Sequence, residues 1–233
     1  MRGSGHGVRE NPGIASVSLT FLLKDKSRPV SEQKRPFTFV SFIHYWQNSP
    51  PAYRKLLIGL LAFALFNSSD VFLLLKVKQA GLSDTTVIGL YILYNLVYAV
   101  AAYPLGHLGD RLGLKTVFIA GLAVFSLVYG GMAFTNGLYI FCALFFLYGI
   151  FAAATEGIAK AWISNIVSSN QTATAIGTYT AFQSICTMIA SSLAGVLWLK
   201  AGAEFTFLLS AIVVVGVIIY FLLQRELSLA RVT

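Results

Sequence analysis

The chain has 233 residues, of which 57% are hydrophobic and only 11% are charged, and its mean hydropathy is +0.74. Soluble globular domains carry about 25% charged residues, so this composition excludes an ordinary soluble domain and indicates a polytopic membrane protein. The formal net charge is +8. We attribute this charge to orientation in the membrane and to attraction by anionic lipid, and not to a nucleic-acid partner.

The first 53 residues differ from the rest of the chain, because they are rich in charge, Ser and Pro. Near their end, four apolar residues recur at helical spacing: Phe39, Phe42, Ile43 and Trp46. This spacing predicts a short helix that either lies on the membrane surface or contacts the rest of the protein. We expect a cytosolic linker over residues 1–53, a transmembrane domain over 54–225 and a cytosolic tail over 226–233.

Six apolar stretches follow, and each is long enough to cross a bilayer as a helix, which takes about 20 residues. They cover residues 56–75, 86–105, 116–134, 138–166, 172–199 and 203–223. The expected fold class is therefore an all-α membrane protein with six transmembrane helices. An even number of spans puts both chain ends on one side. The Lys and Arg residues are concentrated on that side, which predicts that both termini are cytoplasmic.

Polar residues interrupt the first span with the run Asn67-Ser68-Ser69-Asp70. A charged side chain near the bilayer centre costs about 2.5–3.5 kcal/mol, which makes it a candidate for function. We expect Asn67 and Asp70 to bind an ion, a proton or a polar substrate. The alternative is that Asp70 lies near the outer interface or fixes the packing of helices.

Tyrosines mark the second span, where Tyr91, Tyr94 and Tyr98 form a ladder beside Asn95. Tyr94 and Asn95 are candidates for lining a cavity, in which aromatic rings would stack on a substrate. Tyr also occurs in cores and at membrane interfaces, so ordinary packing is the alternative.

A short charged segment, residues 106–115, separates the second and third spans. Glycines let the backbone reverse within a few residues, and charged side chains hold the turn in water. The residues that carry this pattern are Gly106, Asp110, Arg111, Gly113 and Lys115. They predict a tight cytoplasmic hinge, and the alternative is an ordinary cytosolic loop.

The fourth span carries two opposite charges, Glu156 and Lys160. They are four residues apart and share one helix face, where they can pair. In one interpretation, protonation of Glu156 or Asp70 breaks a pairing and biases one conformation of the protein. In the other, the charges form a structural pair within or between helices.

Hydroxyl residues in the fifth span recur at steps of four and three along one helix face, beside Gln183: Thr180, Ser184, Thr187 and Ser191. Such a stripe either lines an aqueous path or allows close helix packing. The neighbouring Ala190 and Ala194 favour packing.

The sequence lacks the patterns of catalytic and metal-binding sites. The two cysteines, Cys142 and Cys186, fall in predicted spans, where they behave as small apolar residues. No Ser/His/Asp set and no metal-ligand spacing is present, so we expect neither an enzyme nor a cofactor.

The pattern Gly-x-x-x-Asp-Arg-x-Gly-x-Lys at residues 106–115 resembles the signature loop of the major facilitator superfamily. Residues 163–177 resemble the short connection into the eleventh helix of that family. The glycine spacing of Gly106 and Gly113 recurs in Gly195 and Gly202, at an offset of 195 − 106 = 89 residues. This recurrence indicates a repeat of three helices.

The resemblance implies a central cytosolic loop followed by the carboxy-terminal six-helix half of a twelve-helix fold, arranged as a 3+3 inverted repeat. It implies proton-coupled secondary transport of a small molecule by alternating access, in a plasma membrane of the bacterial inner type. Asp110 would lie near the start of the fifth span, and the 106–115 segment would act as a conformational gate.

In that family the substrate path lies between the two halves. The implied partners are therefore the lipid bilayer, a small-molecule substrate, and a second six-helix half. That second half is either a missing amino-terminal half or another copy of this chain. The alternative function is a six-helix membrane scaffold or subunit that acts through partner proteins.

Overall fold

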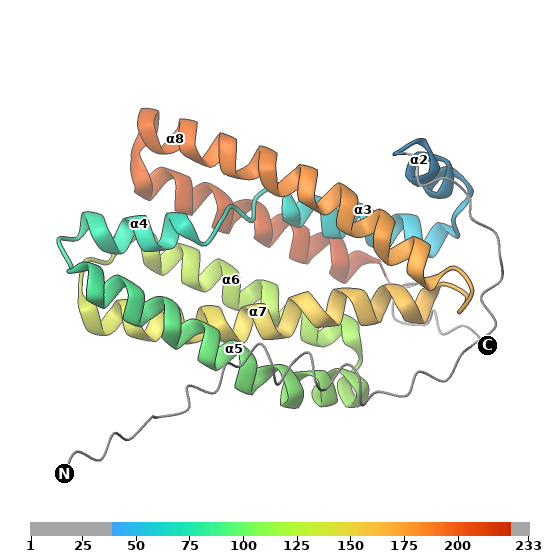
Figure 1. The fold of residues 1–233 in the computed structure, drawn as a ribbon, viewed down its shortest axis with the longest axis horizontal. Coiled ribbons are helices and arrows are strands. Elements are labelled where there is room, and N and C mark those ends of the chain that lie inside the picture. The colour runs from blue at the N-terminus through green and yellow to red at the C-terminus, as the bar shows by residue number, and fades with distance from the viewer. Residues whose placement is uncertain (1–38, 225–233) are drawn as a thin grey trace, which may run out of the picture. The chain divides into compact units, whose positions relative to one another are not determined.

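The computed structural model of the chain describes residues 39–224, and all regular structure in this range is helical. The helices are α2 (Phe39–Asn48), α3 (Pro51–Ala64), α4 (Val71–Gln79), α5 (Asp84–Leu112), α6 (Leu114–Phe134), α7 (Leu138–Ile166) and α8 (Thr172–Leu223) (Figure 1). The predicted tail, 226–233, and residues 1–38 of the predicted linker lie outside the described residues.

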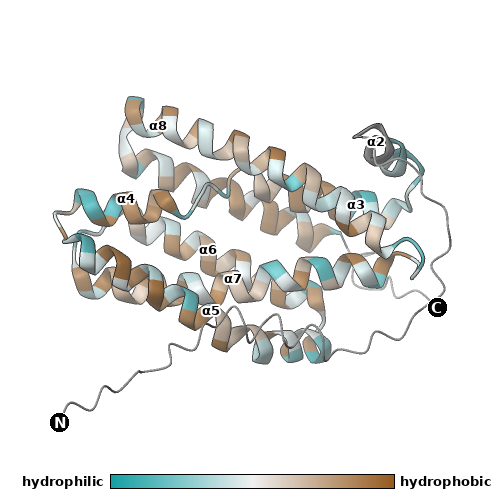
Figure 2. Cartoon of the chain, in the orientation of Figure 1, coloured by the Kyte–Doolittle hydropathy of each residue, from teal (hydrophilic) through white to brown (hydrophobic). Residues whose placement is uncertain are grey.

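Four of the described helices, α5 to α8, are long and apolar enough to cross a membrane. Helix α7 has the predicted bounds, and α6 begins two residues before its predicted span. Apolar residues also cover outward faces (Figure 2), as along α5, where Ile88, Ile92, Leu96 and Val100 are all exposed. A continuous apolar surface of this kind is expected where a helix faces lipid or another helix.

The predicted first span, 56–75, is not one continuous helix. Helix α3 ends at Ala64 and α4 begins at Val71, and residues 65–70 between them are not helical. Asn, Ser and Asp side chains compete for backbone hydrogen bonds and so disfavour a helix interior. Mean hydropathy over a window of residues does not detect this interruption, because the apolar residues on either side of it dominate the mean.

Helix α8 has 52 residues, and at 1.5 Å per residue it would be about 78 Å long, more than twice the thickness of a hydrocarbon core. Gly202 interrupts it with a φ of 86°, and the chain reverses there (Figure 1). We call residues 172–201 the first arm and residues 203–223 the second arm. Trp198 and Phe207, on opposite arms, have ring centroids 5.5 Å apart. The two arms therefore pack against each other.

The predicted loop over residues 106–115 is mostly helical, so this prediction is wrong in its extent. Helix α5 continues to Leu112, and only Gly113, with a φ of 92°, separates it from α6. One glycine in the left-handed region can end a helix and reverse the chain. Gly109 lies inside α5 and is buried; a Cβ there would be 3.0 Å from side-chain atoms of Leu114 and Ile158.

We expect Gly113→Ala to destabilise the protein by about 1–2 kcal/mol, because a Cβ is strained at this positive φ. Gly106→Ala is the matched control, since Gly106 lies inside α5 and no atom is within 4 Å of its added Cβ. That control should be neutral or stabilising by up to about 1 kcal/mol. Thermal unfolding in detergent measures the stability of both variants. Equal losses of stability would contradict the assignment of the turn to Gly113.

The short helix predicted around Phe39 to Trp46 is confirmed as α2. Trp46 packs edge-on against Phe182 of α8, with ring centroids 6.4 Å apart, and Tyr45 packs against Tyr53 of α3 at 5.6 Å. These contacts agree with the alternative in which the helix touches the rest of the protein. Its position on a membrane surface stays a prediction.

Helices α5 and α7 approach each other closely at Gly149. A Cβ at this glycine would lie 2.6 Å from the carbonyl oxygen of Tyr94 and 2.7 Å from the Cβ of Val97. Only glycine allows this spacing, and the close approach brings the tyrosines of α5 beside those of α7. Tyr94 and Tyr148 have ring centroids 5.4 Å apart as a result.

Candidate functional site

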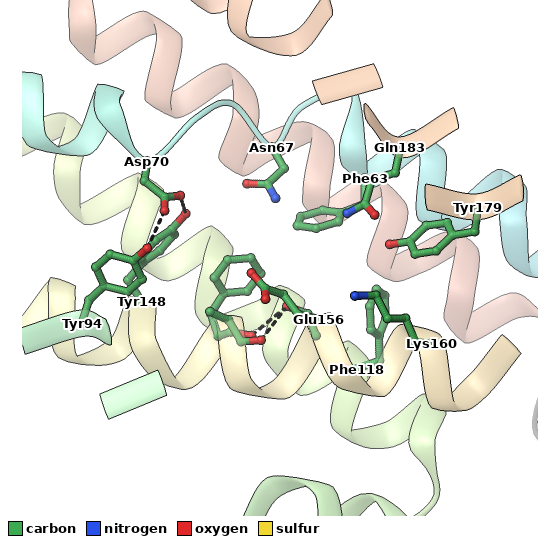
Figure 3. A pocket seen from close by; sticks show the side chains of 13 residues that line it. Phe63, Asn67, Asp70, Tyr94, Phe118, Tyr148, Glu156, Lys160, Tyr179 and Gln183 are labelled. Carbon is green, nitrogen blue, oxygen red and sulfur yellow. Dashed lines mark hydrogen bonds between the residues drawn. The ribbon is translucent and has the colours of Figure 1, made fainter. Parts of the chain in front are cut away.

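A pocket of about 200 Å³ lies among α3, the break at 65–70, and helices α5 to α8. Six residues that the sequence singled out line it: Asn67, Asp70, Tyr94, Glu156, Lys160 and Gln183 (Figure 3). They come from four separate parts of the chain. The fold therefore gathers six of the ten residues predicted for transport or cavity lining into one place.

The carboxylate of Asp70 is held by two tyrosines. Tyr94 Oη donates to Asp70 Oδ2 at 2.7 Å, and Tyr148 Oη donates to Asp70 Oδ1 at 2.5 Å. Asp70 occupies the N-cap position of α4, but its side chain does not cap that helix. Within residues 39–224 no Lys, Arg or His forms an ion pair with it. The Asp70 carboxylate therefore joins α4 to α5 and α7.

The break between α3 and α4 is tied to the first arm of α8. The backbone N–H of Ser69 donates to Ser191 Oγ at 3.2 Å. Asn67 turns its side chain toward the pocket (Figure 3), and its buried Oδ1 has no hydrogen-bond partner within the described residues. The break thus supplies the pocket with a carboxylate and a free amide oxygen.

Glu156 and Lys160 do not form the pair that their spacing allows. Glu156 Oε2 accepts a hydrogen bond from Tyr98 Oη of α5 at 3.0 Å. In the described part of the chain Lys160 makes neither an ion pair nor a hydrogen bond. Both residues line the pocket, so the negative and the positive group are each presented to it separately.

Four predicted cavity-lining residues do not line this pocket: Asn95, Thr180, Ser184 and Thr187. The first three bond to backbone carbonyls of their own helices, Asn95 Nδ2 to Tyr91 at 2.8 Å, Thr180 Oγ1 to Ile176 at 2.9 Å and Ser184 Oγ to Thr180 at 2.9 Å. The neighbouring Ala190 and Ala194 are buried. Thr180 and Ser184 are exposed, so whether the stripe serves packing or an aqueous path stays a prediction.

The residues predicted for the gate lie outside the pocket. Lys115 Nζ donates to the carbonyl of Gln224 at 2.9 Å, which fastens the start of α6 to the end of α8. Asp110 and Arg111 are exposed. Asp110 forms no hydrogen bond or ion pair within residues 39–224. Its electrostatic interaction with the start of α8, which the family resemblance implies, stays a prediction.

Sequence reasoning missed Tyr148 and Tyr179, which also line the pocket. Helical spacing in the sequence could have identified both tyrosines. Tyr148, Ala152, Glu156 and Lys160 follow one another in steps of four along α7, and all four line the pocket. Tyr179 precedes Gln183 by four residues on α8. Each missed tyrosine therefore shares a helix face with a residue that was predicted.

Three phenylalanines supply apolar walls for the pocket: Phe63, Phe118 and Phe151. Phe63 meets both others edge-on, with ring centroids 6.4 Å from Phe118 and 5.9 Å from Phe151. All three are buried. The site therefore combines a few polar groups with a rigid aromatic surface, as small-molecule sites commonly do.

Comparison with known proteins agrees with this architecture. The chain is 29% identical over 218 residues to the uncharacterized MFS-type transporter MJ1317 of Methanocaldococcus jannaschii, and this match covers 90% of the chain and 53% of that protein. It is 27% identical over 177 residues to the uncharacterized MFS-type transporter Rv1250 of Mycobacterium tuberculosis, covering 75% of the chain and 30% of that protein. The chain thus spans about half or less of the length of these relatives. Residues 56–232 match the family model described as Major Facilitator Superfamily, so the chain belongs to this family of membrane transporters.

Proposed function

We propose that the chain forms a six-helix half of a secondary transporter, which moves a small molecule through the pocket by alternating access. The observation that carries this proposal is the pocket itself, where Asp70, Glu156 and Lys160 gather inside an otherwise apolar helix bundle. Ionisable groups within a membrane domain mark substrate or ion pathways. The membership in a transporter family supports the same conclusion.

The six crossings are α3 with α4 as one interrupted crossing, then α5, α6, α7 and the two arms of α8. Their 3+3 arrangement is supported by Gly113 and Gly202, which both adopt positive φ and are 202 − 113 = 89 residues apart. Each glycine follows the second crossing of its group of three. A chain that spans about half of its relatives' length fits one half of such a transporter, and a second half completes the substrate path.

Proton coupling is assigned to the carboxylates of the pocket. Both oxygens of Asp70 accept hydrogen bonds, whereas only one oxygen of Glu156 does. The second oxygen of Glu156 can take up a proton without displacing a donor, which makes Glu156 the better proton carrier. We further propose that both chain ends face the cytoplasm, because the basic residues concentrate on that side.

Cysteine labelling tests alternating access without knowledge of the substrate. Cys142 and Cys186, the only cysteines, are first replaced by alanine, and Ala152→Cys then puts a single thiol in the pocket. A membrane-impermeant thiol reagent should react with it from either face, in right-side-out and in inverted vesicles. Labelling from one face should block labelling from the other.

Ala153→Cys is the matched control, because Ala153 is buried beside Ala152 on α7 and does not line the pocket. It should react from neither face. If the thiol at position 152 reacts from one face only, the pocket does not alternate, and the scaffold interpretation replaces transport.

A further inference from the structure

The two ends of the pocket carry different hydrogen-bonding groups (Figure 3). At one end lies Asp70, an acceptor whose two oxygens are already bonded to Tyr94 and Tyr148. At the other end lie three side chains that can donate: Lys160, Tyr179 and Gln183. Between them lies Asn67, whose buried Oδ1 is an acceptor without a partner in the described residues. A ligand therefore meets an occupied carboxylate at one end, a single amide acceptor beside it, and three available donors at the other end.

None of the three donors has a hydrogen-bond or ion-pair partner within residues 39–224. Tyr179 is the most informative of them, since it is only 6% exposed. The body of the side chain is therefore held by protein, and a phenolic hydroxyl that reaches a binding pocket can donate to a ligand there. The hydroxyl of Tyr179 points into the pocket (Figure 3), so a ligand can supply the missing acceptor.

The positive charge of Lys160 is also left available by its neighbours. Glu156, one helical turn away, accepts its hydrogen bond from Tyr98 instead of from Lys160. A lysine that lines a pocket and forms no ion pair favours an anionic ligand. The carboxylate of Glu156 nearby disfavours a ligand with a second negative charge.

The phenylalanine walls define the remainder of the ligand. Phe63, Phe118 and Phe151 line the same pocket and offer apolar ring surface. A fully ionic or strongly hydrated anion would leave this surface unsatisfied, whereas an aromatic or aliphatic body would cover it. A volume of about 200 Å³ limits that body to a small one.

We propose that the pocket binds a small amphipathic organic monoanion, with its carboxylate hydrogen-bonded by Lys160, Tyr179 and Gln183 and its apolar body against the three phenylalanines. This inference rests on the proposed transport function and names the substrate class of the same pocket.

Three probes with the same phenylpropyl body test the proposal: 3-phenylpropionate, its neutral amide 3-phenylpropanamide, and the cationic 3-phenylpropylamine. Binding to the purified 233-residue chain in detergent is measured by isothermal titration calorimetry. The propionate should bind at least about tenfold more tightly than the other two, because a hydrogen bond to a charged group contributes that much. Equal binding of the amide or the amine, or no saturable binding of the propionate, overturns the proposal.

Variants locate the anion in the pocket. Lys160→Gln should weaken propionate binding by roughly 10- to 100-fold, and Tyr179→Phe by about 3- to 10-fold. Lys160→Arg keeps the charge and should restore most of the affinity. Lys78→Gln is the control for loss of a positive charge, since Lys78 is exposed, bonds to Asp84 and does not line the pocket.

Unchanged propionate affinity in folded Lys160→Gln overturns the assignment, and the melting temperature of each variant shows that it is folded. Failure of this inference is distinguishable from failure of the transport function. If Ala152→Cys still reacts from both faces, the pocket alternates and only the ligand class is wrong. If it reacts from one face while the propionate binds, the anion site exists without transport.

Discussion

Asp70→Ala should lower the stability of the protein by about 2–4 kcal/mol, because the loss of an acceptor costs roughly 1–3 kcal/mol for each buried donor left behind. Two such donors are affected, the hydroxyls of Tyr94 and Tyr148, and both side chains are buried. Asp70 itself is only partly buried, so removing its charge recovers little desolvation energy. The expected observation is a clearly lowered melting temperature in detergent, followed by circular dichroism.

A double-mutant cycle separates this bonding from any general effect at position 70. In a background of Tyr94→Phe and Tyr148→Phe, the same Asp70→Ala change should lower the stability much less, since no tyrosine hydroxyl remains to lose its acceptor. Asp84→Ala is the control for loss of a carboxylate, because its ion pair with Lys78 is exposed, and it should cost less than about 1 kcal/mol. Equal costs of Asp70→Ala in both backgrounds would show that the tyrosines do not depend on the carboxylate.

Gly149→Ala should destabilise the protein by about 1–3 kcal/mol, through overpacking between α5 and α7. The added Cβ meets the backbone carbonyl of Tyr94 at 2.6 Å, and a backbone atom cannot rotate out of the way as a side chain can. The helices must separate, which draws Tyr94 away from Asp70. Thermal unfolding measures the stability, and labelling of Ala152→Cys in the same variant reports whether the pocket is disturbed.

Gly157→Ala is the matched control in the same helix, because no atom lies within 4 Å of its added Cβ. Alanine favours a helix over glycine by up to about 1 kcal/mol, so this variant should be neutral or more stable. The same substitution should therefore lower the stability at position 149 and not at position 157, which separates overpacking from a general effect of alanine in α7. A neutral Gly149→Ala would mean that the two helices have room to spare.

Hydropathy matched the bounds of α7, where Glu156 and Lys160 do not interrupt the helix. It failed where small polar or glycine residues decide the backbone. The break at residues 65–70 depends on contacts such as that of Ser69 with Ser191, which are 122 positions apart. The end of α5 depends on the φ of Gly113, which the nearby Gly106 and Gly109 obscured. The break depends on tertiary contacts, and the end of α5 depends on the conformation of one residue. A hydropathy value averaged over a window of residues contains neither kind of information.

The charged residues of the candidate site and Tyr94 were predicted, whereas two other tyrosines of the site were missed. Asp70, Glu156 and Lys160 stood out because ionised groups are rare in hydrocarbon, and all three reach the pocket. Tyr148 and Tyr179 did not stand out, because tyrosine is common in membrane helices. Which tyrosines carry a role follows only from their partners, as with the donation from Tyr148 to Asp70.

Helix α4 is only nine residues long and is fastened to α5 at both of its ends. At one end Asp70 accepts from Tyr94, and at the other Lys78 is paired with Asp84. The break that precedes α4 is held as well, because Tyr148 of α7 donates to Asp70 and the backbone of Ser69 donates to Ser191 of α8. The direction of α4 is therefore set by side-chain bonds to three other helices, and not by helical continuity with α3.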